Sequence, residues 1–310
     1  MQKNLIELFC GAGGISEGFK NAGFKILLGI DINPVYLSSF AVNHPNAETL
    51  CDDIRHINGS TIKKYVGEKK IYAIVGGPPC QGFSVARKRN VKDSRNNLPL
   101  EFLRIVNEIR PRWFVCENVV GILTAKLPSD ILVKDRFIGK AKKIGYKTEY
   151  RILNAAYFGV PQNRRRVIFI GTRLNKKIRF PSQKGNKTNL SWKILTKKHL
   201  VPKNLFYSKK LIKGFQKREK DNRKKGLGFR WQFLKPKSPS YTIPARYWKD
   251  GSNALVKYKD GSIRMLTEEE CSKIQGFPQN YTFLGNKRKR YEQIGNAVPP
   301  LLAAAIAREI

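Results

Sequence analysis

Short apolar runs alternate with helix-like segments through the first 171 residues. The apolar runs are NLIELF (4–9), KILLGID (25–31), IYAIVGG (71–77), RWFVCENV (112–119) and RVIFIG (166–171). Between them, ISEGFKNAGF and LEFLRIVNEIR carry apolar residues at helical spacing and end near Gly23 and Pro111, where helix stop signals belong. This order of strand, crossover helix and strand predicts an α/β fold with a doubly wound, mostly parallel sheet.

The regular alternation is lost between residues 172 and about 263, where Pro, Gly, Lys and aromatic residues follow in irregular order. We expect a second, smaller and irregular domain over 173–280, after a first domain over 1–172. Near its end, Thr267 and Glu270 have the spacing of a helix capping box. Residues 281–310 end in a short apolar helix, and we expect this segment to complete the first domain.

Positive charge is the strongest compositional feature. The chain has 60 Lys and Arg against 23 Asp and Glu, a net charge of +37. Residues 172–263 alone hold 26 basic and 4 acidic residues. Such a surplus predicts a polyanionic partner, and the middle segment is the expected nucleic-acid surface. The alternative is a set of solvated lysines in a lysine-rich chain.

Other residue patterns argue against several classes of protein. No run of about 18 uncharged apolar residues occurs, and the N-terminal segment turns glycine-rich at once, so we expect a cytoplasmic protein without signal peptide or membrane contact. The five cysteines form no CxxC pair and the three histidines lie far from any ligand spacing. Neither a disulfide scaffold nor a metal site is expected.

A glycine-rich turn follows the first apolar run. Gly11, Gly13 and Gly14 let the backbone approach a ligand at a helix N-terminus. The second run ends in Asp31, which is placed to accept from ribose hydroxyls but could equally cap the helix before Pro34. A nicotinamide enzyme would fit this much. At a third strand end, the Asp53 carboxylate could accept from an adenine amino group, and Ile54 could pack on its ring.

The segment AIVGGPPCQGFS (73–84) brings a cysteine to the end of another strand. Pro78 and Pro79 lack amide donors and fix φ, so the chain leaves the sheet in a rigid turn that presents Cys80 at the carboxyl edge, where ligands of open α/β sheets bind. Nearby arginines could stabilise its thiolate. Glu117 emerges from the next apolar run as either a capping residue or a proton-handling partner.

Taken in order, these segments resemble the DNA (cytosine-5) methyltransferases of prokaryotic restriction-modification systems. Their motifs occur in family order over nearly the whole chain outside 172–263: LFCGAGGISEGF, Asp31, DDI, GGPPCQGFS, ENV, QNRRRVIFIG, RMLTEEECSKIQGFP and QIGNAVPPLLA. The resemblance implies a fold that binds S-adenosyl-L-methionine, with the irregular domain recognising the DNA target.

The resemblance also assigns roles to residues. Cys80 is the implied nucleophile that adds to carbon 6 of cytosine, and Glu117 the carboxyl, protonated by a raised pKa, that holds ring nitrogen N3. Arg166 would hold the cytosine carbonyl, with Arg164 beside the nucleophile or the backbone. A phosphate-binding role for both arginines is the alternative. The implied cofactor residues are Phe9, Gly11, Gly13, Gly14, Asp31, Ile32, Asp53, Ile54, Pro78, Asn296 and Val298.

The implied substrate is double-stranded DNA, with the cytosine flipped out of the duplex. Residues 81–98 would close on the DNA as a polar, basic loop. The expected DNA-binding residues are Gln81, Ser84 and Arg95 in that loop, and Arg230, Thr242 and Arg246 in the recognition domain. For the last three, phosphate contact or loop packing is the alternative to base contact.

Two alternatives to a DNA-modifying enzyme stay open. The tRNA cytosine-5 methyltransferases share the motif set, although their typical CFT segment after the arginine motif is absent here. A catalytically dead DNA-binding regulator would lack the cysteine or the glutamate, and both are present. We expect a monomer. A separate restriction endonuclease could share its site without forming a stable complex.

Overall fold

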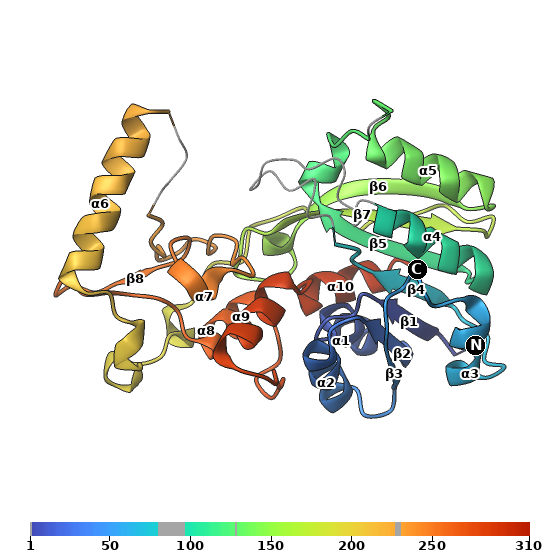
Figure 1. The fold of residues 1–310 in the computed structure, drawn as a ribbon, viewed down its shortest axis with the longest axis horizontal. Helices are drawn as coiled ribbons and strands as arrows, with labels where there is room; N and C mark the ends of the chain where they lie inside the picture. Colours follow the sequence, from blue (N-terminus) through green and yellow to red (C-terminus); the bar gives the residue numbers. More distant parts are fainter. Residues whose placement is uncertain (1, 80–96, 128, 227–230) are drawn as a thin grey trace.

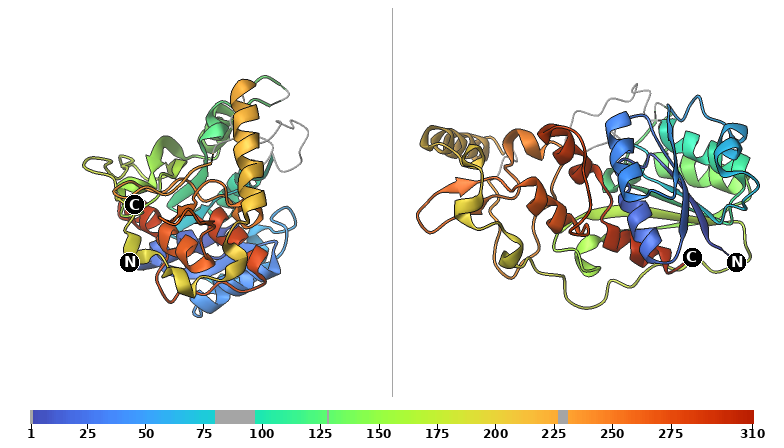
Figure 2. Two further views of the ribbon diagram at one scale, coloured as in Figure 1. Left: turned by 90° about the vertical axis from the view of Figure 1, so that its left-hand side faces the viewer. Right: turned by 90° about the horizontal axis from the view of Figure 1, so that it is seen from below.

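The computed structural model describes residues 2–79, 97–127, 129–226 and 231–310. Figure 1 shows two lobes: a sheet covered by helices, and a second lobe that carries α6 to α9. Both chain ends lie on the sheet lobe in the views of Figures 1 and 2. The Lys3 ammonium joins them by donating to the Ile310 carbonyl, at 2.7 Å.

The first lobe is built on one seven-stranded sheet with the order β3-β2-β1-β4-β5-β7-β6. Its strands are β1 (Asn4–Leu8), β2 (Lys25–Asp31), β3 (Glu48–Cys51), β4 (Ala73–Gly76), β5 (Trp113–Val119), β6 (Lys147–Asn154) and β7 (Arg165–Thr172). Strands β1 to β5 pair in parallel, whereas β7 is antiparallel to both β5 and β6. The predicted doubly wound, mostly parallel sheet is confirmed.

The edge strand β6 has no counterpart among the predicted apolar runs. Most of its residues are exposed or half-buried, so its sequence KTEYRILN lacks a continuous apolar signal. Residues 155–164 connect β6 to β7. A parallel pair needs a crossover of about a dozen residues or more, so this shorter connection is consistent with the antiparallel pairing of the two strands.

Helices cover both faces of the sheet. The helices α1 (Gly14–Asn21), α2 (Pro34–Asn43) and α10 (Pro300–Ala307) share one apolar core, and α3 (Gly59–Val66), α4 (Leu98–Ile109) and α5 (Val133–Lys143) share the other. A Cβ at Gly18 of α1 would lie 2.3 Å from the Pro300 carbonyl oxygen, so only glycine allows α10 to approach this closely. The C-terminal helix therefore packs against the first lobe.

The second lobe has a separate apolar core, which extends from Leu190 to Ile294 and so passes the expected domain boundary at 280. Its elements are α6 (Lys209–Lys224), α7 (Tyr247–Asp250), β8 (Val256–Lys257), β9 (Ile263–Arg264), α8 (Glu268–Gln275) and α9 (Lys287–Asn296). The predicted capping box of α8 is present, with Thr267 and Glu270 exchanging both hydrogen bonds. The sixteen-residue helix α6, by contrast, interrupts a segment expected to be irregular.

Candidate active site

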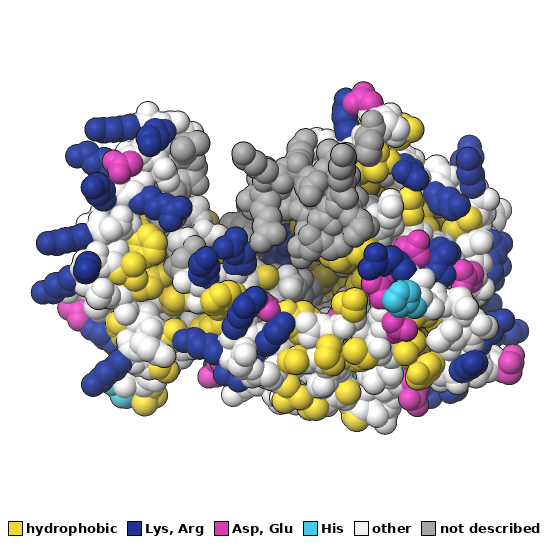
Figure 3. Space-filling view, in the orientation of Figure 1, with side chains coloured by type: hydrophobic (Ala, Val, Ile, Leu, Met, Phe, Trp, Pro, Cys, Tyr) yellow, Lys and Arg dark blue, Asp and Glu magenta, His cyan; other side chains and the backbone are white. Residues whose placement is uncertain are grey.

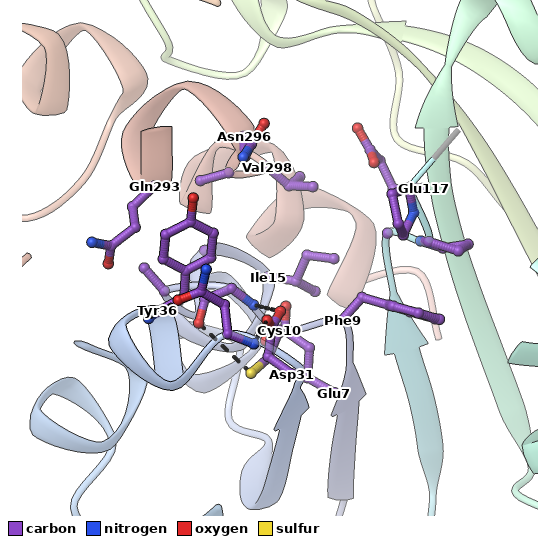
Figure 4. Close-up of a pocket in the computed structure, with 18 of the residues that line it drawn as sticks. Glu7, Phe9, Cys10, Ile15, Asp31, Tyr36, Glu117, Gln293, Asn296 and Val298 are labelled. Atoms are coloured by element: carbon purple, nitrogen blue, oxygen red, sulfur yellow. Dashed lines mark hydrogen bonds between the residues drawn. The ribbon is translucent and has the colours of Figure 1, made fainter. Parts of the chain in front are cut away.

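A cavity of about 720 Å³ opens at the carboxyl ends of β1, β2, β4 and β5. The strand order reverses at β1, which lies between β2 and β4, and such a switch point is where open α/β sheets bind ligands. Figure 4 shows Glu117 on one wall, Asp31 and Glu7 at the strand ends, and Asn296 and Val298 from the C-terminal segment. Residues from both ends of the chain thus share this cavity.

The Asp31 carboxylate organises the glycine-rich turn. One of its oxygens accepts from the Gly11 amide at 2.8 Å, and the other accepts from the Asn33 amide at 2.8 Å. Burial raises the pKa of Asp31. The alternative that Asp31 caps the following helix is wrong, because the Asn33 side chain caps α2 by accepting from the amides of Val35 and Tyr36.

The turn glycines serve different purposes. Gly11 and Gly13 adopt φ of 54° and 88°, in the left-handed region that side chains disfavour. A Cβ at Gly14 would lie 2.4 Å from the Val298 carbonyl oxygen, so this glycine lets the last motif close over the turn. Gly13 packs its backbone against His44 instead. Of the expected cofactor residues, all within the described part of the chain, it alone does not line the cavity.

Residues that follow β2 and β3 line another part of the cavity. Ile54 is buried, whereas Ile32 is 64% exposed at the cavity wall. The Asp53 carboxylate pairs with the Arg55 guanidinium, with 2.9 Å to Nε, and this hydrogen bonding lowers the pKa of Asp53 to about 2. An ionised acceptor and an uncovered aliphatic side chain are suited to a heteroaromatic ring with an amino group.

Glu117 and Arg166 form the chemical wall of the cavity. The Glu117 carboxylate and the Arg166 Nε lie 2.8 Å apart, and both side chains are largely buried. The Arg166 guanidinium pairs with the Glu117 carboxylate in this arrangement, whereas the resemblance implied a protonated carboxyl that binds cytosine. The implied hydrogen bond from Glu117 to a cytosine ring therefore stays a prediction.

Asn118, the next residue of β5, orients the proline turn. Its side-chain amide donates to the Pro78 carbonyl at 3.0 Å, and the residue is buried beside the cavity. Cys80 follows this turn in the sequence, but it lies outside the described residues. No role was predicted for Asn118 from the sequence, although the ENV motif contained it.

Arg164 lines the cavity where the two lobes meet. It is fully buried, and its guanidinium donates to the Gly295 carbonyl at 2.9 Å and to the Ile243 carbonyl at 3.3 Å. Gln162 makes a second connection of this kind. Its Nε2 donates to Gln275 Oε1 at 2.6 Å, and its Oε1 accepts from the Ile243 amide. These side chains join QNRRR (162–166), the segment around Ile243 and the last motif, QIGNAVPPLLA (293–303).

Few of the expected DNA contacts can be placed. Gln81, Ser84, Arg95 and Arg230 lie outside the described residues. Thr242 lines the cavity, and its hydroxyl donates to the Asn163 carbonyl at 2.6 Å. The hydroxyl proton therefore already has an acceptor within the protein. Arg246 is exposed at the start of α7.

Glu7 is a cavity residue that was not predicted from the sequence. It is buried within β1, where its carboxyl accepts from the Ser16 amide at 2.9 Å, and burial raises its pKa to about 8. In the sequence, the sign of this role was an acidic residue inside an otherwise apolar strand. Among the described residues, no acidic, cysteine or histidine cluster could hold a metal, and no helix is long and apolar enough to cross a membrane.

Comparison with known proteins identifies the family. A family model described as C-5 cytosine-specific DNA methylase matches residues 3–310. The chain belongs to this family. It is a DNA (cytosine-5) methyltransferase, so the cavity between its cofactor motif and Glu117 is the candidate active site.

This methyltransferase has relatives in several bacteria. It is 34% identical to the Type II methyltransferase M1.HphI of Haemophilus parahaemolyticus, over 100% of this chain and 87% of the relative. It is 32% identical to the Type II methyltransferase M.DdeI of Desulfomicrobium norvegicum, over 99% and 88%. The solved structure of S. pombe Dnmt2 methyltransferase shares the fold, with a TM-score of 0.76 at 17% identity over 98% and 96%.

Proposed function

We propose that this methyltransferase transfers a methyl group from S-adenosyl-L-methionine to carbon 5 of a flipped-out cytosine at a specific site in duplex DNA. One observation carries the proposal: a single cavity holds the glycine-rich turn on one side and the Glu117–Arg166 pair on the other. A nicotinamide oxidoreductase would not require this pair. Since M1.HphI and M.DdeI are named Type II methyltransferases, we place the enzyme in a restriction-modification system, where a separate endonuclease would share its site.

The cavity residues fit S-adenosyl-L-methionine. The turn at Gly11 offers close backbone approach, Asp31 is fixed beside it, and Ile32 leaves apolar surface for a ring. Asp53 would accept from the adenine amino group, while Asn296 and Val298 would line the opposite wall. When bound, the sulfonium group supplies an electrophilic methyl group.

The protein must make carbon 5 of cytosine nucleophilic. The Cys80 thiolate would form a bond to carbon 6, which shifts the ring electrons toward carbon 5. Glu117 would hold ring nitrogen N3, and Arg166 would hold the carbonyl oxygen. For this, the base must enter between Glu117 and Arg166, and its hydrogen bonds must replace the 2.8 Å contact between the carboxylate and the guanidinium. After methylation, loss of the carbon 5 proton lets the Cys80 sulfur leave as carbon 5 and carbon 6 regain their double bond.

The first experiment incubates the purified enzyme with S-adenosyl-L-methionine and unmethylated duplex DNA, and maps 5-methylcytosine by bisulfite sequencing. We expect marks confined to one short sequence. Marks on tRNA but not on DNA would support the RNA alternative, and unmarked nucleic acid together with DNA binding would support the dead regulator.

The Cys80→Ala variant tests the proposed nucleophile. We expect loss of methylation with unchanged affinity for S-adenosyl-L-methionine, measured by calorimetry. A duplex with 5-fluorocytosine at the mapped position should trap a covalent adduct of the unaltered enzyme, because fluorine at carbon 5 cannot leave as a proton does. Turnover by Cys80→Ala would overturn the covalent mechanism.

A further inference from the structure

Helix α6 of the second lobe carries a row of lysines along one face. Within its sixteen residues it has eight basic and two acidic side chains. Five exposed lysines recur at alternating intervals of three and four residues, which places them on one side of the helix. We call them the lysine stripe: Lys210, Lys213, Lys217, Lys220 and Lys224.

The lysine stripe points away from the core of its lobe. Ile212 and Phe215 lie on the opposite face of α6 and are half-buried. The Phe215 ring packs against Trp231, with 5.2 Å between ring centroids, and against Tyr207, with 5.7 Å. Figure 3 shows Lys and Arg side chains gathered along the outer edge of α6, on the far left of the view.

The stability of the helix does not explain this arrangement. Like charges three and four residues apart repel each other on a helix. Lys209 and Lys210 also lie in the first turn, where the helix dipole favours anions. None of the five stripe lysines forms an ion pair with another described residue. A bound polyanion would relieve this repulsion.

We propose that the lysine stripe binds the phosphate backbone of a second segment of duplex DNA, outside the catalytic cavity and without regard to sequence. The choice of DNA as the polyanion rests on the proposed function. No residue of α6 lines the cavity, so the stripe lies outside the candidate active site. It extends for about 21 Å along the helix, at about 1.5 Å per residue. Duplex DNA carries about one charge per 1.7 Å, so several phosphates lie within reach.

The test compares two variants with the same loss of charge. The stripe variant carries Lys→Gln at the five stripe positions, where glutamine keeps a good helix propensity. The control variant carries Lys→Gln at five exposed lysines of the sheet lobe: Lys63, Lys64, Lys69, Lys142 and Lys143. Each protein, at low concentration, is added to an immobilised short duplex, and capture of a second, labelled duplex is measured.

We expect the stripe variant to lose at least about tenfold in capture of the second duplex. The log–log slope of its affinity against salt concentration should weaken by up to about 4.5, at about 0.9 for each of five lysines. The control variant should keep its capture, and both should methylate a short duplex at the unaltered rate. Equal losses in both variants, or none in the stripe variant, would overturn the proposal. Preferential capture of RNA or anionic vesicles through the stripe would also overturn it.

Methylation and capture are read separately, so the two proposals fail separately. An unaltered enzyme that captures the second duplex but methylates no DNA would refute the proposed function and leave the stripe contact standing. Normal methylation of the short duplex by all three proteins, without stripe-dependent capture, would refute only the lysine stripe.

Discussion

At the scale of single residues, Gly76 at the end of β4 and Gly77 directly after it make room for different neighbours. A Cβ at Gly76 would lie 2.3 Å from the Leu8 carbonyl oxygen, so this glycine allows close pairing within the sheet. A Cβ at Gly77 would lie 3.0 Å from a carboxylate oxygen of Glu117. The first glycine thus serves the fold, and the second leaves space for a proposed catalytic group.

Gly77→Ala should impair chemistry more than folding. The added methyl would press on the Glu117 carboxylate, and a displaced catalytic group commonly costs about tenfold to a hundredfold in rate. We expect that loss in single-turnover methylation, with an unchanged Kd for S-adenosyl-L-methionine. The control is Gly139→Ala in α5, where a Cβ would meet nothing within 4 Å. Equal rates in the two variants would contradict the role given to this contact.

Glu7 makes stability depend on pH. Burial raises the pKa of its carboxyl from 4.5 to about 8. Between these two pH values the unfolded chain has lost the proton that the folded protein retains, so the free energy of unfolding falls as the pH rises. For every pH unit by which the folded and unfolded pKa values differ, this loss amounts to about 1.4 kcal/mol.

Glu7→Gln should remove this dependence, because glutamine cannot ionise and still accepts from the Ser16 amide. Urea unfolding of the variant and the unaltered protein at a series of pH values measures the effect. We expect the variant to gain relative stability, by up to several kcal/mol, as the pH rises from the ordinary pKa of Glu7 to the raised one. A constant difference between the two proteins would show that Glu7 titrates normally.

At the scale of elements, one buried ion pair joins β9 to α8. The Arg264 guanidinium binds Glu270 through two contacts, at 2.7 and 2.8 Å, and both side chains are almost fully buried. Glu270 also accepts from the amides of Thr196 and Thr267. The carboxylate therefore connects three segments of the second lobe.

Arg264→Met should destabilise the protein by about 3–5 kcal/mol, since it leaves the Glu270 charge buried without its partner. Denaturant unfolding measures the loss. Arg290→Met is the matched control: its partner Glu268 is more exposed, and such a pair is worth about 1 kcal/mol or less. Equal losses in the two variants would mean that burial of the Arg264–Glu270 pair has no special effect.

At the scale of the whole molecule, polar side chains join the two lobes, and the net charge of the chain is strongly positive. Arg164 and Gln162 both bind the backbone of Ile243, and Arg164 also binds Gly295, so the segment around Ile243 and the last motif, QIGNAVPPLLA (293–303), are held together. The chain carries a net charge of +37. A polyanion should therefore be attracted to the molecule as a whole before any base is read.

DNA affinity should fall steeply with salt concentration, because lysine and arginine displace counterions from the phosphates. For six to ten phosphate contacts, we expect about a thousandfold to a hundred-thousandfold loss as the salt concentration is raised about fourfold. Fluorescence anisotropy with a labelled duplex measures this slope. A flat response would contradict the electrostatic interpretation of the composition.

The sequence by itself determined the elements whose signals are local. Apolar runs located β1, β2, β4, β5 and β7, because a strand buried on both faces is apolar throughout. Thr267 and Glu270 located the start of α8, because a capping box is contained in four residues. The ordered motifs also identified the family and proposed the candidate site residues.

Only the tertiary structure decided features that depend on contacts distant along the chain. The reversed direction of β7 follows from its hairpin with β6, an edge strand with too little burial to leave an apolar signal. The neighbours of Arg164 come from both lobes, and no spacing in QNRRR predicts them. In the sequence Glu7 only interrupts an apolar run, yet its raised pKa comes from burial beneath the cofactor turn. Sequence patterns report local geometry, whereas burial and partners arise only when distant segments pack together.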